Sequence, residues 1–178
     1  MKRLAARLQS YDDRWICYVN RHWKCREMDW LMLRLTHLGS AGFALIFLLL
    51  WGLLAASPIR GWALEGLIAL VSSHLVVRLC KHLWHRVRPY LQLTHLHTFS
   101  GPLKDYSFPS GHTTAAFSLG TIFILNASWT LPLILPFAVG VGLSRIYLGL
   151  HYPTDVAVGA WLGFLFAAMT HYGLGVLS

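Results

Sequence analysis

Three short groups of polar residues stand out from a chain that is otherwise strongly apolar. They read Lys81-x6-Arg88-Pro89, Pro109-Ser110-Gly111-His112 and Ser144-Arg145-x5-His151-x3-Asp155. Together they supply three fixed cations, two imidazoles, one carboxylate and a glycine turn at the expected start of a helix. Cations hold phosphate oxygens and an oriented imidazole can attack phosphorus, so this inventory fits phosphoryl chemistry.

The first group places two cations at the end of an apolar segment. Lys81 and Arg88 are seven residues apart, so on a continuing helix they lie two turns apart on nearly one face. Arg88 offers a planar fork that matches phosphate oxygens, and Lys81 adds a compact charge. Taken alone, the pair is also typical of side chains that snorkel at the end of a membrane span.

The second group has the pattern of a helix N-terminus. Pro109 ends a loop, Ser110 is a natural N-cap, and Gly111 lets the backbone approach a ligand closely. The free N–H groups of such a helix start favour an anion, and His112 projects at the mouth of the same site. Ordinary helix capping is the alternative interpretation of this tetrapeptide alone.

The third group is the most specific. Arg145 is a deeply placed cation with no carboxylate nearby in the sequence, which calls for an anionic partner. His151 and Asp155 are four residues apart, so the carboxylate can orient the imidazole, and an imidazole so oriented is a good nucleophile. A structural His–Asp capping pair is the alternative.

Composition identifies the environment as a membrane. Of the 178 residues, 56% are hydrophobic and only 12% are charged, against roughly 25% charged in soluble domains. Mean hydropathy is +0.51. The net charge of +8 does not indicate nucleic acid, because the basic residues precede the first span or surround the three groups. The three cysteines are expected to be free or packed thiols, with a Cys17–Cys25 bridge as the minor alternative.

The N-terminal segment, residues 1–28, is predicted to be an amphipathic helix in the membrane interface. Its apolar residues recur at steps of three and four: Leu4, Leu8, Tyr11, Trp15, Val19 and Trp23. A surface helix packed on the bundle would show the same pattern, so both placements stay open. No cleavable signal peptide is expected, because residues 1–26 contain no continuous apolar core.

The rest of the chain, residues 30–175, predicts an all-α polytopic membrane bundle of about five transmembrane helices, within a single domain 1–178. The predicted spans are 30–56, 62–84, 110–126, 131–149 and 153–172, with the longest loop at 86–108. Because successive spans alternate in direction, the three groups fall at one membrane face.

At every fixed position the three groups resemble the signature of the type 2 phosphatidic acid phosphatase family: K-x6-R-P, P-S-G-H and S-R-x5-H-x3-D. The resemblance covers about residues 32–172. It implies that His151 forms a phospho-histidine and that Asp155 orients it. It also implies that His112 protonates the leaving lipid oxygen and then activates water. The remaining site residues would bind the phosphate: Lys81, Arg88, Ser110, Gly111 and Arg145.

The family needs no metal or other cofactor, and three cations stand where magnesium would otherwise be required. The pairs His82–His85 and His95–His97 lack carboxylate or cysteine partners at ligand spacing, so no metal site is expected. Asp105 and Tyr106 are expected either to shape the headgroup entrance or to lie in a loop without contact. Glu65 and His74 are expected to pair with each other inside the second span.

The expected substrate is a lipid phosphate that enters from the bilayer: phosphatidate, phosphatidylglycerol phosphate or undecaprenyl pyrophosphate. Within the resemblance, the intact Lys81 and Gly111 mildly favour the phosphatidate type. Two alternatives use the same scaffold: a lipid phosphotransferase, and a non-catalytic lipid-phosphate binding or transport protein. A homo-oligomer stays open.

The expected location is the cytoplasmic (inner) membrane, with several spans. Family analogy puts the active site on the outer face. The positive-inside rule favours the opposite orientation, because seven basic residues between positions 2 and 26 lie on the site's side. Larger family members have six spans, whereas this sequence predicts five.

Overall fold

The computed structural model describes residues 2–98, 103 and 105–175, and within these ranges every regular element is helical. In chain order the elements are α1 (Lys2–His22), α2 (Arg26–Leu38), α3 (Ala41–Leu54), α4 (Ile59–Trp84), α5 (Pro89–Gln92), α6 (Gly111–Asn126), η1 (Ser128–Thr130), α7 (Leu131–Tyr147) and α8 (Pro153–Gly175). The all-helical membrane bundle predicted from the sequence is therefore confirmed. Part of the predicted loop 86–108, residues 99–102 and 104, lies outside the described residues.

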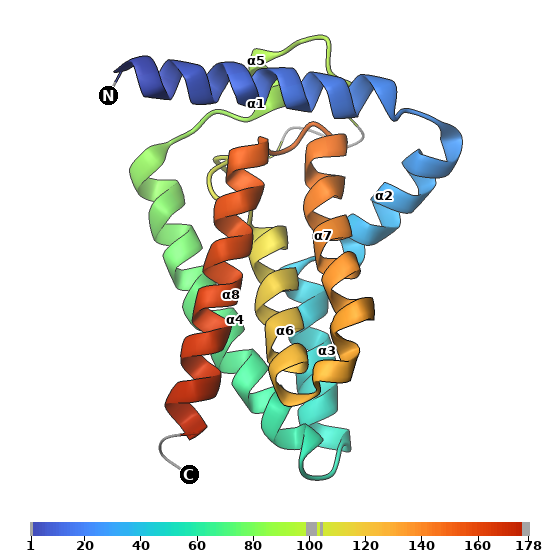
Figure 1. Cartoon of the computed structure of the whole chain (residues 1–178), viewed down its shortest axis with the longest axis vertical. Helices are drawn as coiled ribbons and strands as arrows, with labels where there is room; N and C mark the ends of the chain where they lie inside the picture. Colours follow the sequence, from blue (N-terminus) through green and yellow to red (C-terminus); the bar gives the residue numbers. More distant parts are fainter. Residues whose placement is uncertain (1, 99–102, 104, 176–178) are drawn as a thin grey trace.

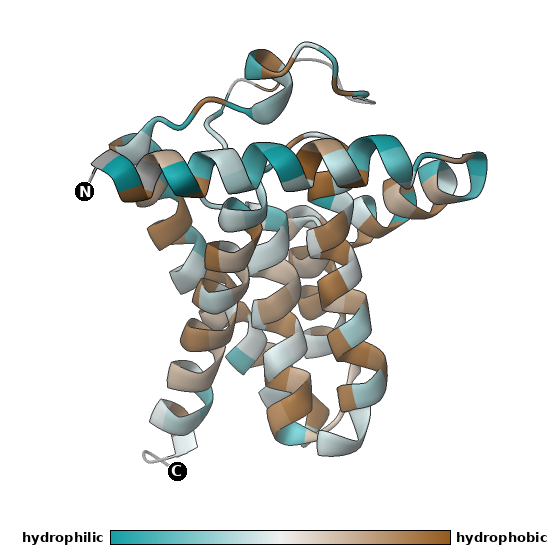
Figure 2. Cartoon of the chain, turned by 45° about the horizontal axis from the view of Figure 1, so that its top comes forward, coloured by the Kyte–Doolittle hydropathy of each residue, from teal (hydrophilic) through white to brown (hydrophobic). Residues whose placement is uncertain are grey.

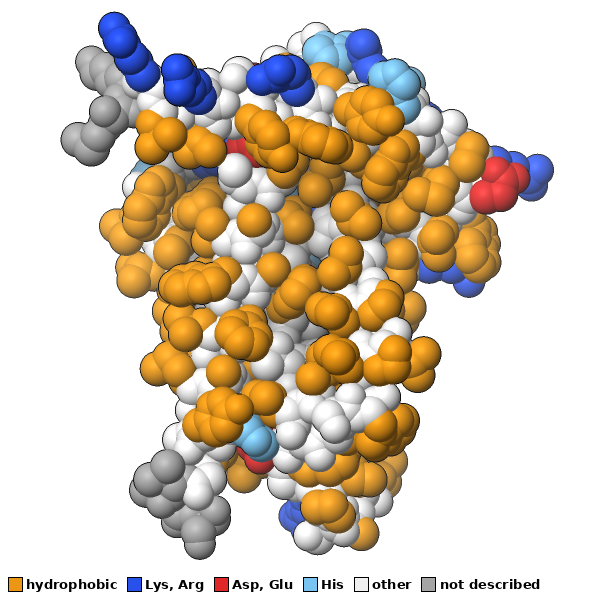
Figure 3. Space-filling view, in the orientation of Figure 1, with side chains coloured by type: hydrophobic (Ala, Val, Ile, Leu, Met, Phe, Trp, Pro, Cys, Tyr) orange, Lys and Arg blue, Asp and Glu red, His pale blue; other side chains and the backbone are white. Residues whose placement is uncertain are grey.

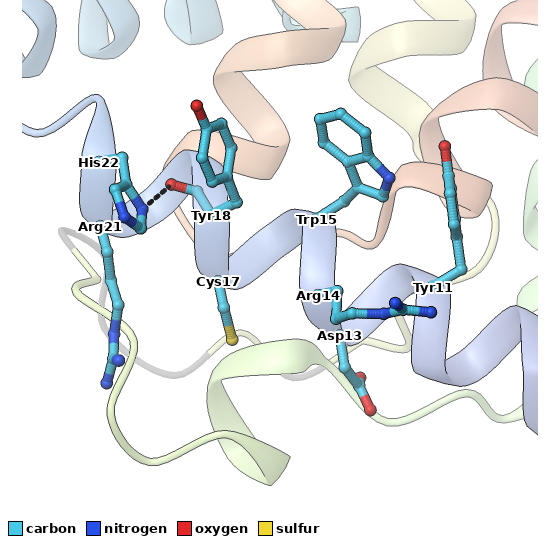
Figure 4. A pocket seen from close by; sticks show the side chains of 8 residues that line it. All are labelled: Tyr11, Asp13, Arg14, Trp15, Cys17, Tyr18, Arg21 and His22. Carbon is cyan, nitrogen blue, oxygen red and sulfur yellow. Dashed lines mark hydrogen bonds between the residues drawn. The ribbon is translucent and has the colours of Figure 1, made fainter.

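Helix α1 lies across one end of the bundle, above the first turns of α8 and the last turns of α7 (Figure 1). Ile16 and Val19 on α1 are buried in the core beneath it. Another side of α1 carries an exposed aromatic row that lines a groove of about 800 Å³. Figure 4 shows Tyr11, Trp15 and Tyr18 of this row pointing to one side of the helix, opposite Asp13, Cys17 and Arg21.

Polar and apolar residues alternate along α1, whereas apolar residues dominate the bundle below it (Figure 2). In the space-filling view, hydrophobic side chains cover the bundle while basic side chains gather along the edge formed by α1 (Figure 3). Helix α1 thus packs on the bundle and also exposes apolar rings. Its placement in the membrane interface stays a prediction.

The first predicted span, residues 30–56, consists of two helices separated by a break. Helices α2 and α3 meet at an angle of 55° around Gly39 and Ser40. Ser40 caps α3 by accepting a hydrogen bond from Phe43 N at 3.1 Å. Gly39 packs against the side chain of Val141, where a Cβ would clash. The break therefore depends on a local cap and on a tertiary contact.

Three segments of the described chain are long and apolar enough to cross a membrane: 59–92, 128–147 and 153–175. The bent pair α2–α3 qualifies as a fourth if it is one span. Helix α6 has 16 residues and lies at the centre, where it packs against α4, α7 and α8. Apart from the bend, the predicted spans match the observed helices to within a few residues.

Small residues let α6 and α8 approach closely. A Cβ at Gly163 would lie 2.5 Å from Thr114 O and 2.8 Å from Ser118 N. A Cβ at Gly159 would lie 2.6 Å from Ser110 O. The small residues of α8 thus hold the start of α6 against the start of α8, as expected for membrane helices. The three cysteines are free thiols, so the Cys17–Cys25 alternative is wrong.

Candidate active site

The three sequence groups meet in one cavity of about 530 Å³ beneath α1. Helices α4, α6 and α7 and the loops that precede α5, α6 and α8 provide its walls. Six of the predicted site residues line it: Lys81, Arg88, Gly111, His112, Arg145 and His151. The other two, Ser110 and Asp155, are fully buried behind this wall.

His151 is held by a backbone carbonyl. Its Nδ1 lies 2.7 Å from Ser107 O. Because a carbonyl only accepts, Nδ1 carries the proton and the lone pair of a neutral ring is on Nε2. Arg88 Nη1 donates to Nε2 at 3.3 Å, so the guanidinium lies directly beside this nitrogen. Burial, reinforced by the charges of Arg145, Arg88 and Lys81, lowers the pKa of His151 well below its usual value. The ring is therefore neutral.

Asp155 lies beside His151 without a direct hydrogen bond to it. Its Oδ2 is 3.7 Å from His151 Nδ1 and accepts a hydrogen bond from Tyr152 N at 2.9 Å. Its Oδ1 accepts from Arg86 Nη1 at 2.6 Å. Asp155 is therefore joined to the imidazole only indirectly, through the backbone of the loop that carries both residues. Ser107, the direct partner, carries no signal in the sequence because it contributes a carbonyl.

The two arginines are fixed by different partners. Arg88 is 3% exposed and donates from Nε to Asp105 O and from Nη1 to Leu150 O, both at 2.9 Å. Arg145 is 4% exposed and donates from Nη1 to Thr36 Oγ1 on α2. Among the described residues, Arg145 Nε is a buried donor without an acceptor. Such a donor gains by meeting an anion in the cavity.

Asp105 enters the cavity and contacts two of these cations. Its Oδ2 lies 2.5 Å from Lys81 Nζ, and its Oδ1 lies 2.7 Å from Arg88 Nη2. Although burial opposes it, the contacts with Lys81 and Arg88 lower the pKa of Asp105 to about 2. Asp105 therefore shapes the entrance, and the alternative of a loop residue without contacts is wrong.

Helix α6 begins at the cavity as predicted, but its cap differs from the expectation. Ser110 occupies the N-cap position, yet its hydroxyl is bonded to Thr113 Oγ1 at 2.9 Å and caps no backbone N–H. Ser110 N itself donates to Asp155 O at 3.0 Å. This bond joins the start of α6 to the start of α8. The first N–H groups of α6 therefore stay available beside Gly111.

Two further residues of α4, His74 and Arg78, line the same cavity. His74 Nδ1 is 3.0 Å from Leu70 O, while Nε2 is buried without a partner among the described residues. The predicted Glu65–His74 pair is wrong, because nine residues correspond to two and a half helical turns and place the side chains on opposite faces. Glu65 instead pairs with His171 Nδ1 at 2.9 Å.

Comparison with known proteins agrees with this arrangement. Residues 62–176 match the family model described as the PAP2 superfamily, a match that begins after α1. The chain belongs to the PAP2 superfamily. It is 33% identical to the Bacitracin transport permease protein BcrC of Bacillus licheniformis over 136 residues, which cover 76% of this chain and 67% of the relative. It is 32% identical to the Undecaprenyl-diphosphatase BcrC of Bacillus subtilis over 144 residues, covering 78% and 73%.

The fold is also similar to that of a solved crystal structure. The crystal structure of Aquifex aeolicus LpxE superposes with a TM-score of 0.78, covering 89% of this chain and 93% of that one, at 23% sequence identity. This likeness concerns the fold alone. The family and the sequence relatives make this PAP2 chain a multi-pass membrane protein of the lipid phosphatase class.

Proposed function

We propose that this PAP2 protein removes the terminal phosphate of a membrane lipid through a phospho-histidine on His151. The observation that carries this proposal is the position of His151. Its neutral Nε2 faces a cavity lined by Lys81, Arg88 and Arg145, while Ser107 O fixes the opposite nitrogen. A fixed, neutral nucleophile beside preorganised cations is what displacement at phosphorus needs.

In the first step Nε2 attacks the terminal phosphorus and the bond from phosphorus to the lipid-side oxygen breaks. His112 donates its proton to that oxygen as the lipid leaves. In the second step His112 takes a proton from water, the water oxygen attacks phosphorus, and the P–N bond breaks. Inorganic phosphate is released, and His151 and His112 return to their initial protonation states.

The phosphate oxygens would contact the cationic side chains of the cavity in both steps. Lys81, Arg88 and Arg145 would neutralise the charge that spreads over them, and the backbone N–H at Gly111 would add a neutral donor from the α6 start. Ser110 would support this turn from behind. Asp155 would stabilise the positive charge that His151 acquires when it is phosphorylated. With this many fixed cations, no metal is required for charge neutralisation.

We propose a polyprenyl diphosphate of the undecaprenyl type as the main substrate. The support comes from the relatives, since the B. subtilis protein is named as an undecaprenyl-diphosphatase. The sequence alone leaned towards phosphatidate, and both substrates present the same terminal phosphoryl group. Phosphatidate and phosphatidylglycerol phosphate are therefore the alternatives that an assay must include.

The deciding experiment measures phosphate release from these three lipids by the purified protein, with His151→Ala as the control. Phosphate release that depends on His151 supports hydrolysis. Transfer of labelled phosphate to an acceptor lipid without free phosphate would favour the phosphotransferase alternative. If the protein binds lipid phosphates but shows no turnover that depends on His151, the transport alternative is favoured. The B. licheniformis relative is named as a transport permease.

We also propose the cytoplasmic membrane with the site on its outer face. The support for this face is the resemblance to a family whose active site usually faces outward. The basic N-terminal segment argues for the opposite side, so orientation needs a direct measurement.

A further inference from the structure

Arg86 joins two buried carboxylates from opposite ends of the chain. Its Nη1 donates to Asp155 Oδ1 at 2.6 Å, and its Nη2 donates to Asp12 Oδ2 at 2.7 Å. The side chains of Asp12 and Asp155 are 1% and 0% exposed, while that of Arg86 is 22% exposed. The guanidinium carbon lies 4.1 Å from the centre of the Tyr152 ring, which fixes its plane. Arg86 precedes the first signature arginine by two residues and is not part of the signature.

Asp12 of α1 also caps α8. Its Oδ1 accepts from Thr154 N at 3.0 Å, and its Oδ2 accepts from Thr154 Oγ1 at 2.5 Å. Thr154 lies in the first turn of α8, where backbone N–H groups have no partner within the helix. A side chain from another helix fills this role. His151 lies three residues before Thr154, so the cap fixes the loop that carries the imidazole.

The same contacts set the charge beside His151. Two carboxylates share one guanidinium, so the group Asp12, Arg86 and Asp155 carries a net negative charge. Asp155 Oδ2 places that charge 3.7 Å from His151 Nδ1. Without the charge of Asp12, Arg86 would balance Asp155 one to one. The imidazole would then lose the negative charge that offsets its own positive charge during phosphoryl transfer.

We propose that Asp12 and Arg86 are positioning residues of the phosphoryl-transfer reaction, and that α1 is therefore a component of the active site. They touch neither the reacting atoms nor the cavity wall, and they act through Asp155 and the start of α8. This inference rests on the proposed role of His151. Figure 1 shows α1 directly over the first turn of α8, where this contact is made.

The test compares the full-length protein with Asp12→Asn and Asp12→Ala, assayed on the lipid that the wild type hydrolyses. Asn keeps an oxygen for the Thr154 N–H but loses the charge, whereas Ala loses both. Glu27→Gln is the matched control, because it removes one negative charge from an exposed residue of α2. Both Asp12 variants should lower kcat about tenfold with KM little changed, the order of effect seen when the hydrogen-bond partners of metal-binding histidines are removed.

The pH dependence of kcat/KM in Asp12→Asn distinguishes a positioning role of Asp12 from an effect on folding alone. The charged and titratable groups around His151 are Lys81 on α4, Arg88 before α5, Arg145 on α7, His112 on α6 and the carboxylates of Asp155 and Asp105. Removing the charge of Asp12 disfavours imidazolium further, so the acidic limb of kcat/KM should move to lower pH in Asp12→Asn. A loss of folded protein alone would scale the whole profile without moving it.

Two results overturn the inference: an unshifted acidic limb in Asp12→Asn, or kcat values within twofold of Glu27→Gln. If Asp12→Ala does not fold, Arg86→Lys takes its place, because Lys keeps the charge but cannot bridge two carboxylates with a planar fork. A wild-type protein that releases no phosphate from any lipid would refute the proposed function instead. An active wild type with unaffected Asp12 variants refutes only the role of α1.

Discussion

Asp105 Oδ1 lies 2.7 Å from Arg88 Nη2, so a carboxylate takes up one of the guanidinium edges that we assign to phosphate. The side chain of Arg88 is 3% exposed, whereas that of Asp105 is 55% exposed. The buried guanidinium is held by backbone carbonyls from two loops. The carboxylate of Asp105, and not its backbone carbonyl, is therefore the partner that can move aside when a phosphate arrives.

Asp105→Asn should bind phosphate more tightly than the wild type. Removing a half-exposed competing ion pair is worth about 1 kcal/mol, or about fivefold in affinity. The inhibition constant of inorganic phosphate and the KM for lipid should both fall by this order. Because the pKa of Asp105 is about 2, its carboxylate is charged throughout the physiological range, and mild acid should not reproduce the effect. If Asp105 instead held the cations in place, both constants would rise.

His112→Asn should remove acid–base catalysis while leaving the phosphate-binding cations Lys81, Arg88 and Arg145 in place. A positioned acid–base group contributes about 10²- to 10⁴-fold, and turnover should fall by that order. The measurement is steady-state phosphate release across pH. Near-wild-type turnover in the variant would refute the assignment of His112.

Gly163→Ala should destabilise the bundle. Its Cβ would lie 2.5 Å from Thr114 O and 2.8 Å from Ser118 N, so α6 and α8 must separate, at a cost of about 1–3 kcal/mol. Gly173→Ala in the same helix is the control, because nothing lies within 4 Å of its Cβ. Thermal unfolding in detergent should show a lower Tm for the first variant only. Equal Tm values would mean that the close approach of α6 and α8 does not limit stability.

Cys25 reports which membrane face carries the site. It is exposed and lies between α1 and α2, a connection that Figure 1 places at the same end of the bundle as the end of α7 and the start of α8. A variant with Cys17→Ser and Cys80→Ser keeps this thiol alone. If the site faces outward, a membrane-impermeant maleimide should label it on intact cells. Labelling only after the cells are permeabilised would place the site inside and agree with the basic N-terminal segment.

Removing metal should leave turnover unchanged. Lys81, Arg88 and Arg145 supply the charge that a divalent cation would otherwise provide. Phosphate release should therefore be the same with and without excess EDTA, measured after dialysis against the chelator. Loss of activity that magnesium restores would show that the three cations are insufficient.

The sequence predicts the convergence of the three groups because span direction alone determines it. Helix starts with clear signals, such as Gly111 and Pro153, were also predictable. The bend at Gly39 was not, because it depends partly on a contact with Val141, a residue far along the chain. The length of the apolar segment 30–56 predicted one continuous helix at this place.

The residues around the site were harder to predict than the site itself. Ser107 acts through its carbonyl, which every residue type has. Asp12 and Arg86 are charged residues in an amphipathic helix and at the end of a span, where solvated charges are common. Only the packing of α1 over α8 brings Asp12 to Arg86, which also binds Asp155. Such partners are visible once the loops are placed in space.

Arg145 Nε is a buried donor with no acceptor among the described residues, so an anion in the cavity should stabilise the fold. A buried donor without an acceptor costs about 1–3 kcal/mol, and this cost disappears when an oxyanion reaches it. Occupancy and heat resistance are therefore linked, and the protein should withstand warming best while vanadate or another phosphate mimic is bound. The protein should therefore stay folded longer in a membrane rich in its lipid substrate than in a membrane that lacks this lipid.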